Sequence, residues 1–593
     1  MMSCKRYIGI DLGTTYSVVA RVDRGGHIGC VPNREGESLT PSVVAVDEEG
    51  RLVAGKEAVD VLQTDPGRAA EAFKRHMGEA DYVVRLGGRE YTPVALSACL
   101  LKRLVEDAQH AVGDVDGAVI TVPAHFGDRQ RSATLDAAAR AGINVVAIIN
   151  EPTAAALANA FEQYVSAGGD PSDLEKATIA STAPGISVVC DLGGGTFDLT
   201  VIRINGSDFD VLATGGSLQL GGRDWDDRIV DEMERHLLST GGPDPHHDPA
   251  ARARMRMAAQ AAKHVLTVKP QAAVQPPYPG SPPCTLTRER FEHLSEGLLW
   301  RLRECTAAVM SDAVLAWSDV HDLMLVGGAT RMPMVRRLVQ QISGLVPNTR
   351  LQPDLTVAQG AAVFAAIHSV HEAMAPAGRR TAAAGRAASA PAAGDDNGEA
   401  EMDALVDDVI DSAGHSLEAL ARGSGQGGFD EAFAAAAGSV RLRDVNSHSL
   451  GVMVRSPRYD KKVNTILIPR NTPLPAECRR VFATRVDNQS RIRIPVLEGE
   501  VRELDACTQI GTCTIEALPS NLPKGSPVSV TLRYDANGTV RVRAEEMSTQ
   551  TAAEAVIDRS ATVIDQRATE GGNGKPHDRV DELAAALAQL GGG

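Results

Sequence analysis

The chain of 593 residues is long enough for two to four domains, each with a core of its own. Its formal net charge of −16 disfavours general binding to nucleic acid and adhesion to an anionic membrane. The sequence has no apolar run of the length of a signal or membrane-spanning segment, and its nine cysteines form no CxxC pair, so neither a zinc site nor a disulfide framework is indicated. We expect a cytoplasmic protein with reduced thiols that binds neither nucleic acid nor membrane.

Two similar loops each follow an apolar run that predicts a buried strand. Residues 10–15 read IDLGTT, and residues 190–196 read CDLGGGT. In such a loop glycine lets the backbone approach phosphate oxygens, threonine hydroxyls add donors, and aspartate supplies an oxygen to hydrated magnesium. A single DLGT sequence is more typical of a tight turn with a capping aspartate. Two copies at predicted strand ends instead indicate an internal duplication that holds one phosphate chain between the loops.

Residues 1–370 alternate apolar strands with helical stretches, which is typical of an α/β domain with helices on both sheet faces. Aromatic residues are sparse at 4%, whereas Ala and Gly are heavily used, which suggests closely packed helices. Residues 371–439 are predicted to be an Ala/Gly-rich linker, because their first part lacks the apolar residues of a core. Short helices are predicted within it over Met402–Ala421 and Asp430–Ala437.

From residue 440 to residue 546 the apolar period changes to two, which predicts an antiparallel β domain. One hairpin is expected between Val528–Leu532 and Val540–Val542, through an Asn-Gly turn. Residues 547–593 are predicted to be a mostly disordered tail with one short helix near its end.

Two stretches are highly specific to one family: NEPTAAALA at residues 150–158 and DLGGGTFD at residues 191–198. Further matching stretches are Ile8–Val18, Lys74-Arg75, Ala118–Phe126 with Arg131, Val211–Asp226, Leu325–Pro333, Ser449–Gly451 and Val486–Ser490. On these residues the chain resembles the heat shock protein 70 (DnaK-type) chaperones, as a divergent member with a long interdomain insert and no full helical lid. The resemblance implies an α/β actin-like, two-lobed ATPase domain over 1–370, followed by an antiparallel β-sandwich domain over 440–546 that binds extended peptide.

The resemblance also implies ATP/ADP and Mg²⁺ as cofactors, with K⁺ as a candidate monovalent ion. Asp11 and Asp191 are expected to hold the metal through water. Lys74 is expected beside the γ-phosphate as a compact positive charge, and Glu151, Thr196 and Asp198 are expected to position the attacking water. The expected nucleotide-binding residues are Gly13, Thr14, Thr15, Tyr16, Gly194, Gly195, Gln260, Lys263, Thr267, Gly327, Gly328 and Arg331. Outside these motifs, isolated charged residues such as Lys74 would be interpreted as solvated at the surface.

Adenosine recognition departs from the family pattern at two positions. The ribose-binding glutamate of the family corresponds to Gln260, and a usual arginine corresponds to His264. Glutamine still donates and accepts hydrogen bonds, so we expect weaker rather than absent nucleotide binding, with a loss on the order of 1 kcal/mol.

Larger departures concern partners. The family arginine that docks J-domain co-chaperones is Ala147, and His125 and Gly127 replace a usual Tyr and Asn, so standard J-domain docking is not expected to be retained. A dedicated J-domain co-chaperone and a nucleotide exchange factor remain candidate partners. Arg441 and Arg443 interrupt the apolar linker that normally docks into the ATPase domain, which should weaken interdomain coupling.

Three residues of the family's coupling relay keep their identity: Pro123, Arg131 and Asp444. In the β domain, the positions that match the peptide cleft are Val452, Phe482, Arg485, Ile492 and Ile494. The less favoured alternative for the four apolar ones is an ordinary sandwich core. Arg485 and, by a looser alignment, Arg455 replace the apolar or small residues that arch over the peptide, and they should favour ligands with acidic or polar flanks.

The sequence thus predicts an ATP-dependent molecular chaperone that hydrolyses ATP to control the binding of unfolded or extended peptide segments. One alternative is a regulatory or scaffold protein in which ATP switches binding of one dedicated partner. Another is an actin-like or sugar-kinase-like enzyme of the same superfold. The β domain disfavours the kinase, since a small-molecule kinase needs no such module.

Overall fold

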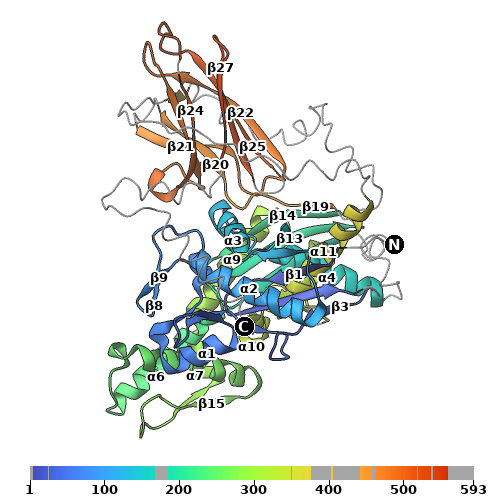
Figure 1. Cartoon of the computed structure of the whole chain (residues 1–593), viewed down its shortest axis with the longest axis vertical. Helices are drawn as coiled ribbons and strands as arrows, with labels where there is room; N and C mark the ends of the chain where they lie inside the picture. Colours follow the sequence, from blue (N-terminus) through green and yellow to red (C-terminus); the bar gives the residue numbers. More distant parts are fainter. Residues whose placement is uncertain are drawn as a thin grey trace. The chain divides into compact units, whose positions relative to one another are not determined.

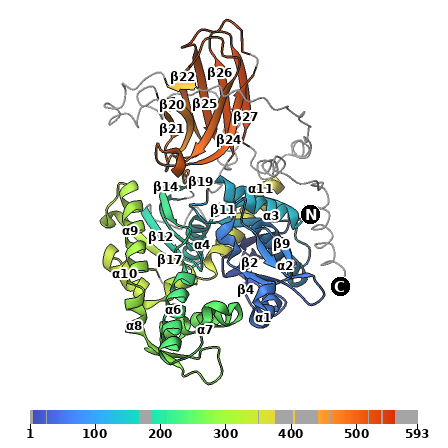
Figure 2. The ribbon, with the colours of Figure 1, turned by 90° about the vertical axis from the view of Figure 1, so that its left-hand side faces the viewer.

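The computed structural model describes residues 5–23, 26–166, 185–206, 208–348, 350–374, 402–404, 441–456, 461–516, 518–535 and 539–557. These residues form two compact units (Figures 1 and 2). Unit 1 holds the described residues up to Ala373, together with Arg441 and Leu442. Unit 2 holds the others, including Met402–Ala404 and the chain from Arg443 onward.

The first sheet of unit 1 is arranged around its N-terminal strand. In spatial order its strands are β11 (Val145–Asn150), β10 (Gly117–Val122), β1 (Tyr7–Asp11), β2 (Tyr16–Val22) and β3 (Ile28–Val31), with β4 (Thr40–Pro41) also paired to β2. β1, β10 and β11 are parallel, whereas β2 runs antiparallel to both β1 and β3. The apolar run before the first glycine loop is therefore a buried strand, as predicted.

Helices cover both faces of this sheet (Figure 1). They are α2 (Pro93–Val112), α3 (Asp128–Arg140), α4 (Glu151–Ser166) and α11 (Thr356–Met374). Ile8 and Ile10 pack in one cluster with α2 and α3, and Tyr7 packs with α4 and α11 in another, because side chains alternate along a strand. Gly9 approaches α11 so closely that an added Cβ would collide with the backbone at Ala362. This close approach accounts for part of the heavy use of glycine and alanine.

The second sheet of unit 1 carries the second glycine loop. In spatial order its strands are β17 (Val320–Val326), β12 (Gly185–Leu192), β13 (Phe197–Asn205), β14 (Asp208–Ser217) and β19 (Arg441–Arg443). β12 and β13 form an antiparallel hairpin, and its turn is the loop at residues 193–196. Phe197 and Trp225 are fully buried in the core of this half. The helices around it are α6 (Gly222–Ser239), α7 (Pro249–Val268), α8 (Arg288–Leu294), α9 (Glu296–Asp312) and α10 (Pro333–Ser343).

Smaller elements complete unit 1. A three-stranded sheet packs against helix α1 and consists of β6 (Leu52–Ala54), β5 (Val43–Val46) and β7 (Ala69–Glu71). The remaining elements are α1 (Lys56–Thr64) and the hairpins β8 (Val84–Leu86) with β9 (Arg89–Tyr91) and β15 (Gln271–Val274) with β16 (Cys284–Thr287). Two short 3₁₀ segments, η2 (Phe73–His76) and η5 (Gly328–Arg331), carry residues of the site described below.

Unit 2 is a β structure (Figure 2) in which all described strand pairs are antiparallel except the parallel pairing of β18 with β20, and its strands enclose one apolar core. Its strands are β18 (Met402–Ala404), β20 (Leu450–Ser456), β21 (Lys461–Ile468), β22 (Ala476–Thr484), β23 (Ile492–Glu498), β24 (Thr508–Ile515), β25 (Pro527–Tyr534), β26 (Val540–Glu546) and β27 (Thr551–Val556). The predicted hairpin is present, because β25 and β26 pair in antiparallel register with Leu532 opposite Val542. The two-residue period between residues 440 and 546 therefore predicted the type of structure correctly.

Two predictions about this part of the chain are wrong. The helix predicted over Met402–Ala421 is a strand at its first three residues, because β18 pairs with strands of unit 2 on both of its sides. The β structure also continues beyond residue 546, since Thr551–Val556 forms β27 against β26. The other parts of the predicted linker helices and of the C-terminal tail lie outside the described residues.

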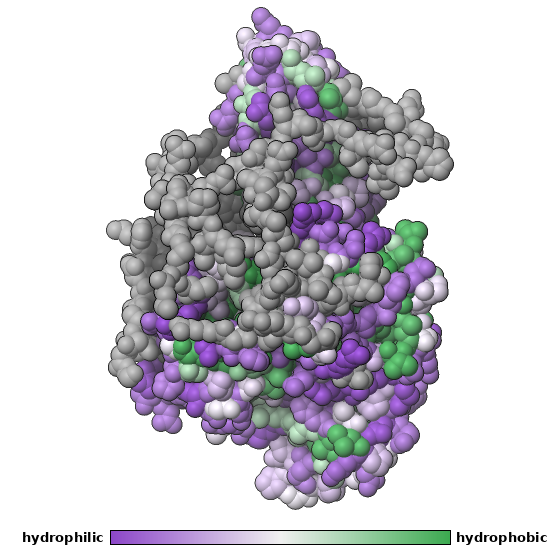
Figure 3. All heavy atoms as spheres, turned by 90° about the vertical axis from the view of Figure 1, so that its right-hand side faces the viewer, coloured by the Kyte–Doolittle hydropathy of each residue, from purple (hydrophilic) through white to green (hydrophobic). Residues whose placement is uncertain are grey.

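Hydrophilic residues dominate the described part of the face in Figure 3, and the hydrophobic residues there form small separate groups. Isolated apolar side chains are normal at a protein surface. No helix within the described ranges combines the length and the apolar character needed to cross a membrane.

Candidate functional site

A cavity of about 440 Å³ lies in unit 1, where both glycine loops end. The residues of the predicted site on its wall are Asp11, Gly13, Thr14, Thr15, Tyr16, Lys74, Glu151, Asp191, Gly194, Thr196, Gln260, Lys263, Thr267, Gly327, Gly328 and Arg331. Gly195 and Asp198 are not part of this wall. The structure thus brings together residues that are separated by more than 300 positions in the sequence.

The two loops contact each other, and both line the cavity. A Cβ added at Gly194 would collide with the side chain of Thr15, and one added at Gly195 would collide with Thr14. Gly327, which enters from the end of β17, has a φ of 80° and approaches the backbone of Leu192. Glycine is required because a side chain would collide with the facing loop at Gly194 and Gly195 and with the Leu192 backbone at Gly327. The result is a narrow cradle lined by backbone and threonine hydroxyl groups.

A buried ion pair lies at the wall of this cavity. Lys74 Nζ lies 2.8 Å from Glu151 Oε1, and the two side chains are only 6% and 9% exposed. Segment η2 carries Lys74, and Glu151 is the first residue of α4, directly after β11. Lys74 Nζ also lies 5.7 Å from the ring centre of Phe126. Neither charged residue is a solvated surface residue, which was the alternative interpretation of the sequence.

Four carboxylates gather around this lysine: Asp11, Glu151, Asp191 and Asp198. Burial raises the pKa of Asp11 and Asp191, and burial together with the neighbouring acids raises the pKa of Glu151 to about 7, against the opposing effect of Lys74. Four carboxyl groups beside one ammonium group are not all favoured in the ionised form, and a divalent cation would favour the ionised forms. In the described ranges no group of three His, Cys, Asp or Glu side chains forms a metal cage. Magnesium usually retains several waters, so two of these carboxylates suit it.

Asp198 has a partner that the sequence did not identify. Oδ1 of Asp198 accepts a hydrogen bond from the backbone N–H of His125 at 3.1 Å and lies 2.5 Å from His125 Nδ1. Both side chains are buried. Asp11 is held in a similar way, since Thr121 Oγ1 donates to its Oδ1 at 3.2 Å. His125 therefore lies at the carboxylate cluster, although the sequence related it only to co-chaperone docking.

The opposite end of the cavity is lined by α7 and η5. Lys263 Nζ forms an ion pair with Asp226 at 2.8 Å and donates to the carbonyl of Gly222 at 2.8 Å. Burial raises the pKa of Asp226 to about 6, although Lys263 acts in the opposite direction. Arg331 is fixed by Asp354 through a 2.6 Å ion pair. Neither acidic partner was predicted, because the pairing of each aspartate with its cation depends on the fold rather than on the local sequence.

The departures at Gln260 and His264 lie in this same region. Both residues lie on α7 and line the cavity beside Lys263 and Thr267. Burial lowers the pKa of His264, and the neighbouring Lys263 acts in the same direction. The imidazole is therefore disfavoured as a cation where the family has an arginine.

Three ion pairs join β7 and η2 to helices α6 and α7, and we call them the bridging pairs. Arg75 Nη2 lies 2.6 Å from Asp224, and Arg223 Nη2 lies 2.6 Å from Glu71. Arg256 Nη1 reaches the same Glu71 at 3.1 Å. Glu71 and Arg75 belong to β7 and η2, whereas their partners lie on α6 and α7, which lie side by side in Figures 1 and 2.

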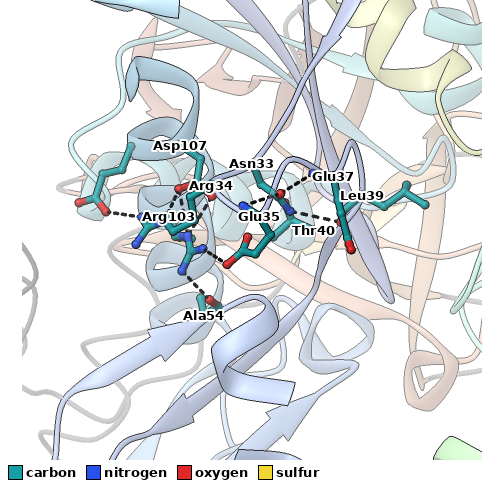
Figure 4. Close-up of polar contacts among 10 residues, drawn as sticks. Asn33, Arg34, Glu35, Glu37, Leu39, Thr40, Ala54, Arg103 and Asp107 are labelled. Atoms are coloured by element: carbon teal, nitrogen blue, oxygen red, sulfur yellow. Dashed lines mark hydrogen bonds and ion pairs between the residues drawn. The ribbon is translucent and has the colours of Figure 1, made fainter. Parts of the chain in front are cut away.

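A polar network supports the segment before β4, from which Leu39 reaches the cavity wall (Figure 4). Arg103 on α2 pairs with Asp107 at 2.9 Å and with Glu35 at 2.7 Å, and it donates to the carbonyl of Ala54. Arg34 pairs with the same Asp107 at 2.6 Å. These contacts attach the segment that carries Leu39 to α2.

Comparison with known proteins assigns this arrangement to a family. The family model described as Hsp70 protein matches residues 7–85, 79–376 and 418–573. The chain belongs to the Hsp70 family. Among curated proteins, the chaperone protein DnaK of Halobacterium salinarum is 34% identical over 591 residues, covering 98% of this chain and 78% of the relative. The chaperone protein DnaK of Thermotoga neapolitana is 34% identical over 550 residues, covering 91% of this chain and 78% of the relative. The resemblance stated from the motifs is thereby confirmed.

The residues expected to couple the Hsp70 domains are found in both units. Arg131 donates to Asn150 Oδ1 at 2.6 Å and to the carbonyl of Phe126 at 3.1 Å, and Pro123 closes the same turn through its carbonyl. Arg131 is therefore bonded to the residue directly before Glu151. Asp444 belongs to unit 2, where its carbonyl accepts from the backbone N–H of Leu474.

The linker segment before Asp444 contributes an edge strand to unit 1. In β19 the arginines are exposed, whereas Leu442 is half-buried and packs against the cluster of α4 and α11. Arg441 lies 3.9 Å from Asp208 of β14. Leu442 thus packs this linker segment against unit 1, between the two arginines that we expected to weaken interdomain coupling.

The apolar residues expected in the peptide cleft of an Hsp70 lie in the core of unit 2. Val452, Phe482, Ile492 and Ile494 are all fully buried and belong to one cluster. Arg485 follows β22 and is half-buried, and its backbone N–H donates to Gln489 at 3.1 Å. Burial alone fits both interpretations of the four apolar residues, as cleft or as core.

Proposed function

We propose that this Hsp70 protein hydrolyses ATP in the cavity of unit 1 and uses the reaction to control the binding of extended peptide by unit 2. Unit 1 would then be an actin-like, two-lobed ATPase domain, with one lobe around each of its two large sheets. The observation that carries the proposal is the contact between the two glycine loops beside the buried Lys74–Glu151 ion pair. Such a cradle suits a chain of phosphates, and the lysine supplies positive charge where the γ-phosphate would lie.

Each group in the cavity has a task in this reaction. Asp11 and Asp191 would hold hydrated Mg²⁺, whose charge offsets that of the phosphates and of the carboxylate cluster. Glu151, Thr196 and Asp198 would orient the attacking water, with His125 fixing Asp198. Phosphoryl transfer needs little covalent chemistry from the protein, so positioning and electrostatics account for the catalysis. K⁺ is a further candidate ion beside the same carboxylates.

The other end of the cavity would accept the nucleoside. Gln260, Lys263 and Thr267 line α7 at the proposed ribose position, and Arg331 offers a planar guanidinium to the base. The pairing of Arg331 with Asp354 supports this role, because it fixes the guanidinium plane. Unfolded or extended peptide segments would be the ligands of unit 2, and a J-domain co-chaperone and a nucleotide exchange factor would be further partners.

The test is single-turnover ATP hydrolysis by the full chain, with Mg²⁺ or with EDTA, in the presence of a panel of unfolded peptides. We expect hydrolysis that depends on Mg²⁺ and is accelerated by several unrelated peptides. Acceleration by a single native protein, with no response to any peptide, would favour the ATP-switched scaffold instead. No hydrolysis with Mg²⁺ would refute the assignment of the cavity.

A further inference from the structure

The short strand β18 lies inside unit 2 rather than beside it. Asp403 is the parallel register partner of Arg455 on β20. On its other side β18 pairs with β22 in antiparallel register, with Met402 opposite Thr484, Asp403 opposite Ala483 and Ala404 opposite Phe482. A backbone paired on both sides in this way is an added strand between two sheet edges.

Strand β18 also joins two groups of strands. The sheet order runs β24-β23-β20-β18-β22-β25-β26-β27, with β21 paired to β20. Without β18 the order separates into one group around β20 and another that begins at β22. Each group would then present an open edge with unpaired backbone groups, which is how extended peptides are commonly recognised.

This position coincides with the proposed peptide cleft. Phe482 is a direct register partner of β18, and Arg485 follows the paired part of β22 by one residue. Val452 lies on β20, three residues before the paired Arg455. The segment Met402–Ala404 therefore occupies the place that the proposed function assigns to an extended ligand.

The segment lies outside the parts of the chain that the family model matches. The family model covers residues up to 376 and resumes at 418, so Met402–Ala404 falls in the gap between them. Residues 405–440 connect β18 to β19 in the same chain. A ligand tethered in this way acts at an effective concentration on the order of millimolar, even when its intrinsic affinity is modest.

Charge explains why this segment suits this cleft. Between residues 395 and 411 the sequence contains eight acidic residues and no lysine or arginine. The acidic residues are Asp395, Asp396, Glu399, Glu401, Asp403, Asp407, Asp408 and Asp411. The cleft side presents arginine at two positions, since Arg455 pairs in register with Asp403 and Arg485 follows the partner of Met402. Opposite charges on a ligand and its binding site favour that ligand and disfavour basic ones.

We propose that Met402–Ala404 is a built-in ligand of the peptide cleft, which external peptides must displace, and that the preferred external peptides share its pattern of short apolar segments between acidic flanks. The proposal rests on the proposed function of unit 2 as a peptide binder. Self-occupancy would restrict the chaperone to ligands that outcompete the tethered strand. Few peptides with basic flanks would do so, because the arginines oppose them.

The test compares variants of the full chain in binding a fluorescent peptide with the sequence of residues 399–411. Asp403→Pro removes a backbone N–H and fixes φ, so the variant should release β18. Its matched control is Asp396→Pro, the same change in the same acidic stretch outside β18. We expect Asp403→Pro to bind the peptide about tenfold more tightly than the unmodified chain, as relief from a tethered competitor predicts, and Asp396→Pro to bind like the unmodified chain.

A second variant, which lacks residues 395–411, covers the case in which the proline disturbs folding, and it should match Asp403→Pro. Amide hydrogen exchange at Phe482–Thr484 should be faster in both variants and slow again when the peptide is added. Equal peptide affinity in all four proteins would refute self-occupancy while leaving peptide binding intact. Tighter binding of a peptide whose acidic residues are replaced by lysine would refute the ligand class. Binding of no peptide by any variant, with normal ATP hydrolysis, would refute the proposed function of unit 2 itself.

Discussion

Lys74 and Glu151 are 77 positions apart in the sequence, yet they form a 2.8 Å ion pair that is almost completely buried. A lysine in such a place is held by its partner, because an unpaired buried charge would be costly. The pair also fixes the ammonium group at the wall of the cavity formed by the two glycine loops. Positive charge that is already in position stabilises a transition state without further reorganisation.

Replacing Lys74 by alanine should therefore affect the chemical step more than binding. We expect Lys74→Ala to bind ATP with near-normal affinity and to hydrolyse it about 100-fold more slowly or worse, because the lost charge acts mainly on the transition state. Single-turnover hydrolysis and calorimetric binding separate the two effects. Lys56→Ala, at an exposed lysine of α1, is the matched control. Unchanged hydrolysis in Lys74→Ala would remove this residue from the active site.

The carboxylate cluster predicts a specific dependence on metal. Asp191→Asn should abolish the gain in nucleotide affinity that Mg²⁺ provides, because an amide is a weaker ligand than a carboxylate for a hard cation. The measurement is ATP affinity with Mg²⁺ and with EDTA, which should differ in the unmodified chain and agree in the variant. Asp114→Asn, at an exposed loop position, should behave like the unmodified chain. Tight binding of magnesium-ATP by Asp191→Asn would contradict the assignment of the two loops.

Ala147 occupies the position where the family has an arginine that docks J-domain co-chaperones. A generic J-domain should stimulate hydrolysis only weakly, and Ala147→Arg should improve the stimulation by restoring a charged docking contact. Ala147 is half-buried on β11, so Ala147→Met serves as a control for the added bulk without charge. Strong stimulation of the unmodified chain would show that a different surface docks the J-domain.

Glu500 predicts how the stability of unit 2 depends on pH. Although partial burial works against its charged form, hydrogen bonds from His448 and Ser449 lower the pKa of Glu500 from 4.5 to about 2. A carboxyl group with a lowered pKa stabilises the folded state above its unfolded pKa, and this contribution is lost as the pH falls through its folded pKa. Stability from this group should thus be complete above about pH 5 and decline towards pH 2.

Thermal unfolding of the chain between pH 6 and pH 2.5 checks this prediction. Glu500→Gln should lower the melting temperature of unit 2 at pH 6 and flatten its fall in acid. Glu503→Gln, at a nearby exposed position, should change neither. If the melting temperature of Glu500→Gln falls with decreasing pH as steeply as that of the unmodified chain, other carboxyl groups determine this fall.

The sequence was sufficient to predict two glycine loops at the ends of buried strands, because each is a short local motif after a strong apolar strand. It was also sufficient to predict that Lys74 and Glu151 belong to one site, although only through the resemblance to a family. The partners His125, Asp226 and Asp354 were not assigned to the site. Each of them contacts a site residue that lies on another element of the fold, so the contact can be recognised only from the structure.

The wrong predictions have a common physical cause. Thr551–Val556 reads TAAEAV, and the sequence after Met402 reads DALVDD, and neither has the β-branched alternation of a typical strand. Alanine and acidic residues favour a helix or a solvated tail when considered locally. Pairing with β26 in the first case, and with β20 and β22 in the second, overrides that preference. Strand propensity depends on the neighbours, and a single sequence does not specify them.

The bridging pairs have a consequence for how long a nucleotide stays bound. Each of these pairs contains an arginine, whose charge persists at any physiological pH, and partial burial of the side chains reduces screening by salt. Opening the cavity would have to separate Glu71 from two guanidinium groups at once. The three arginine ion pairs should therefore limit how fast a bound nucleotide dissociates. Glu71→Gln should speed this dissociation without changing the two glycine loops.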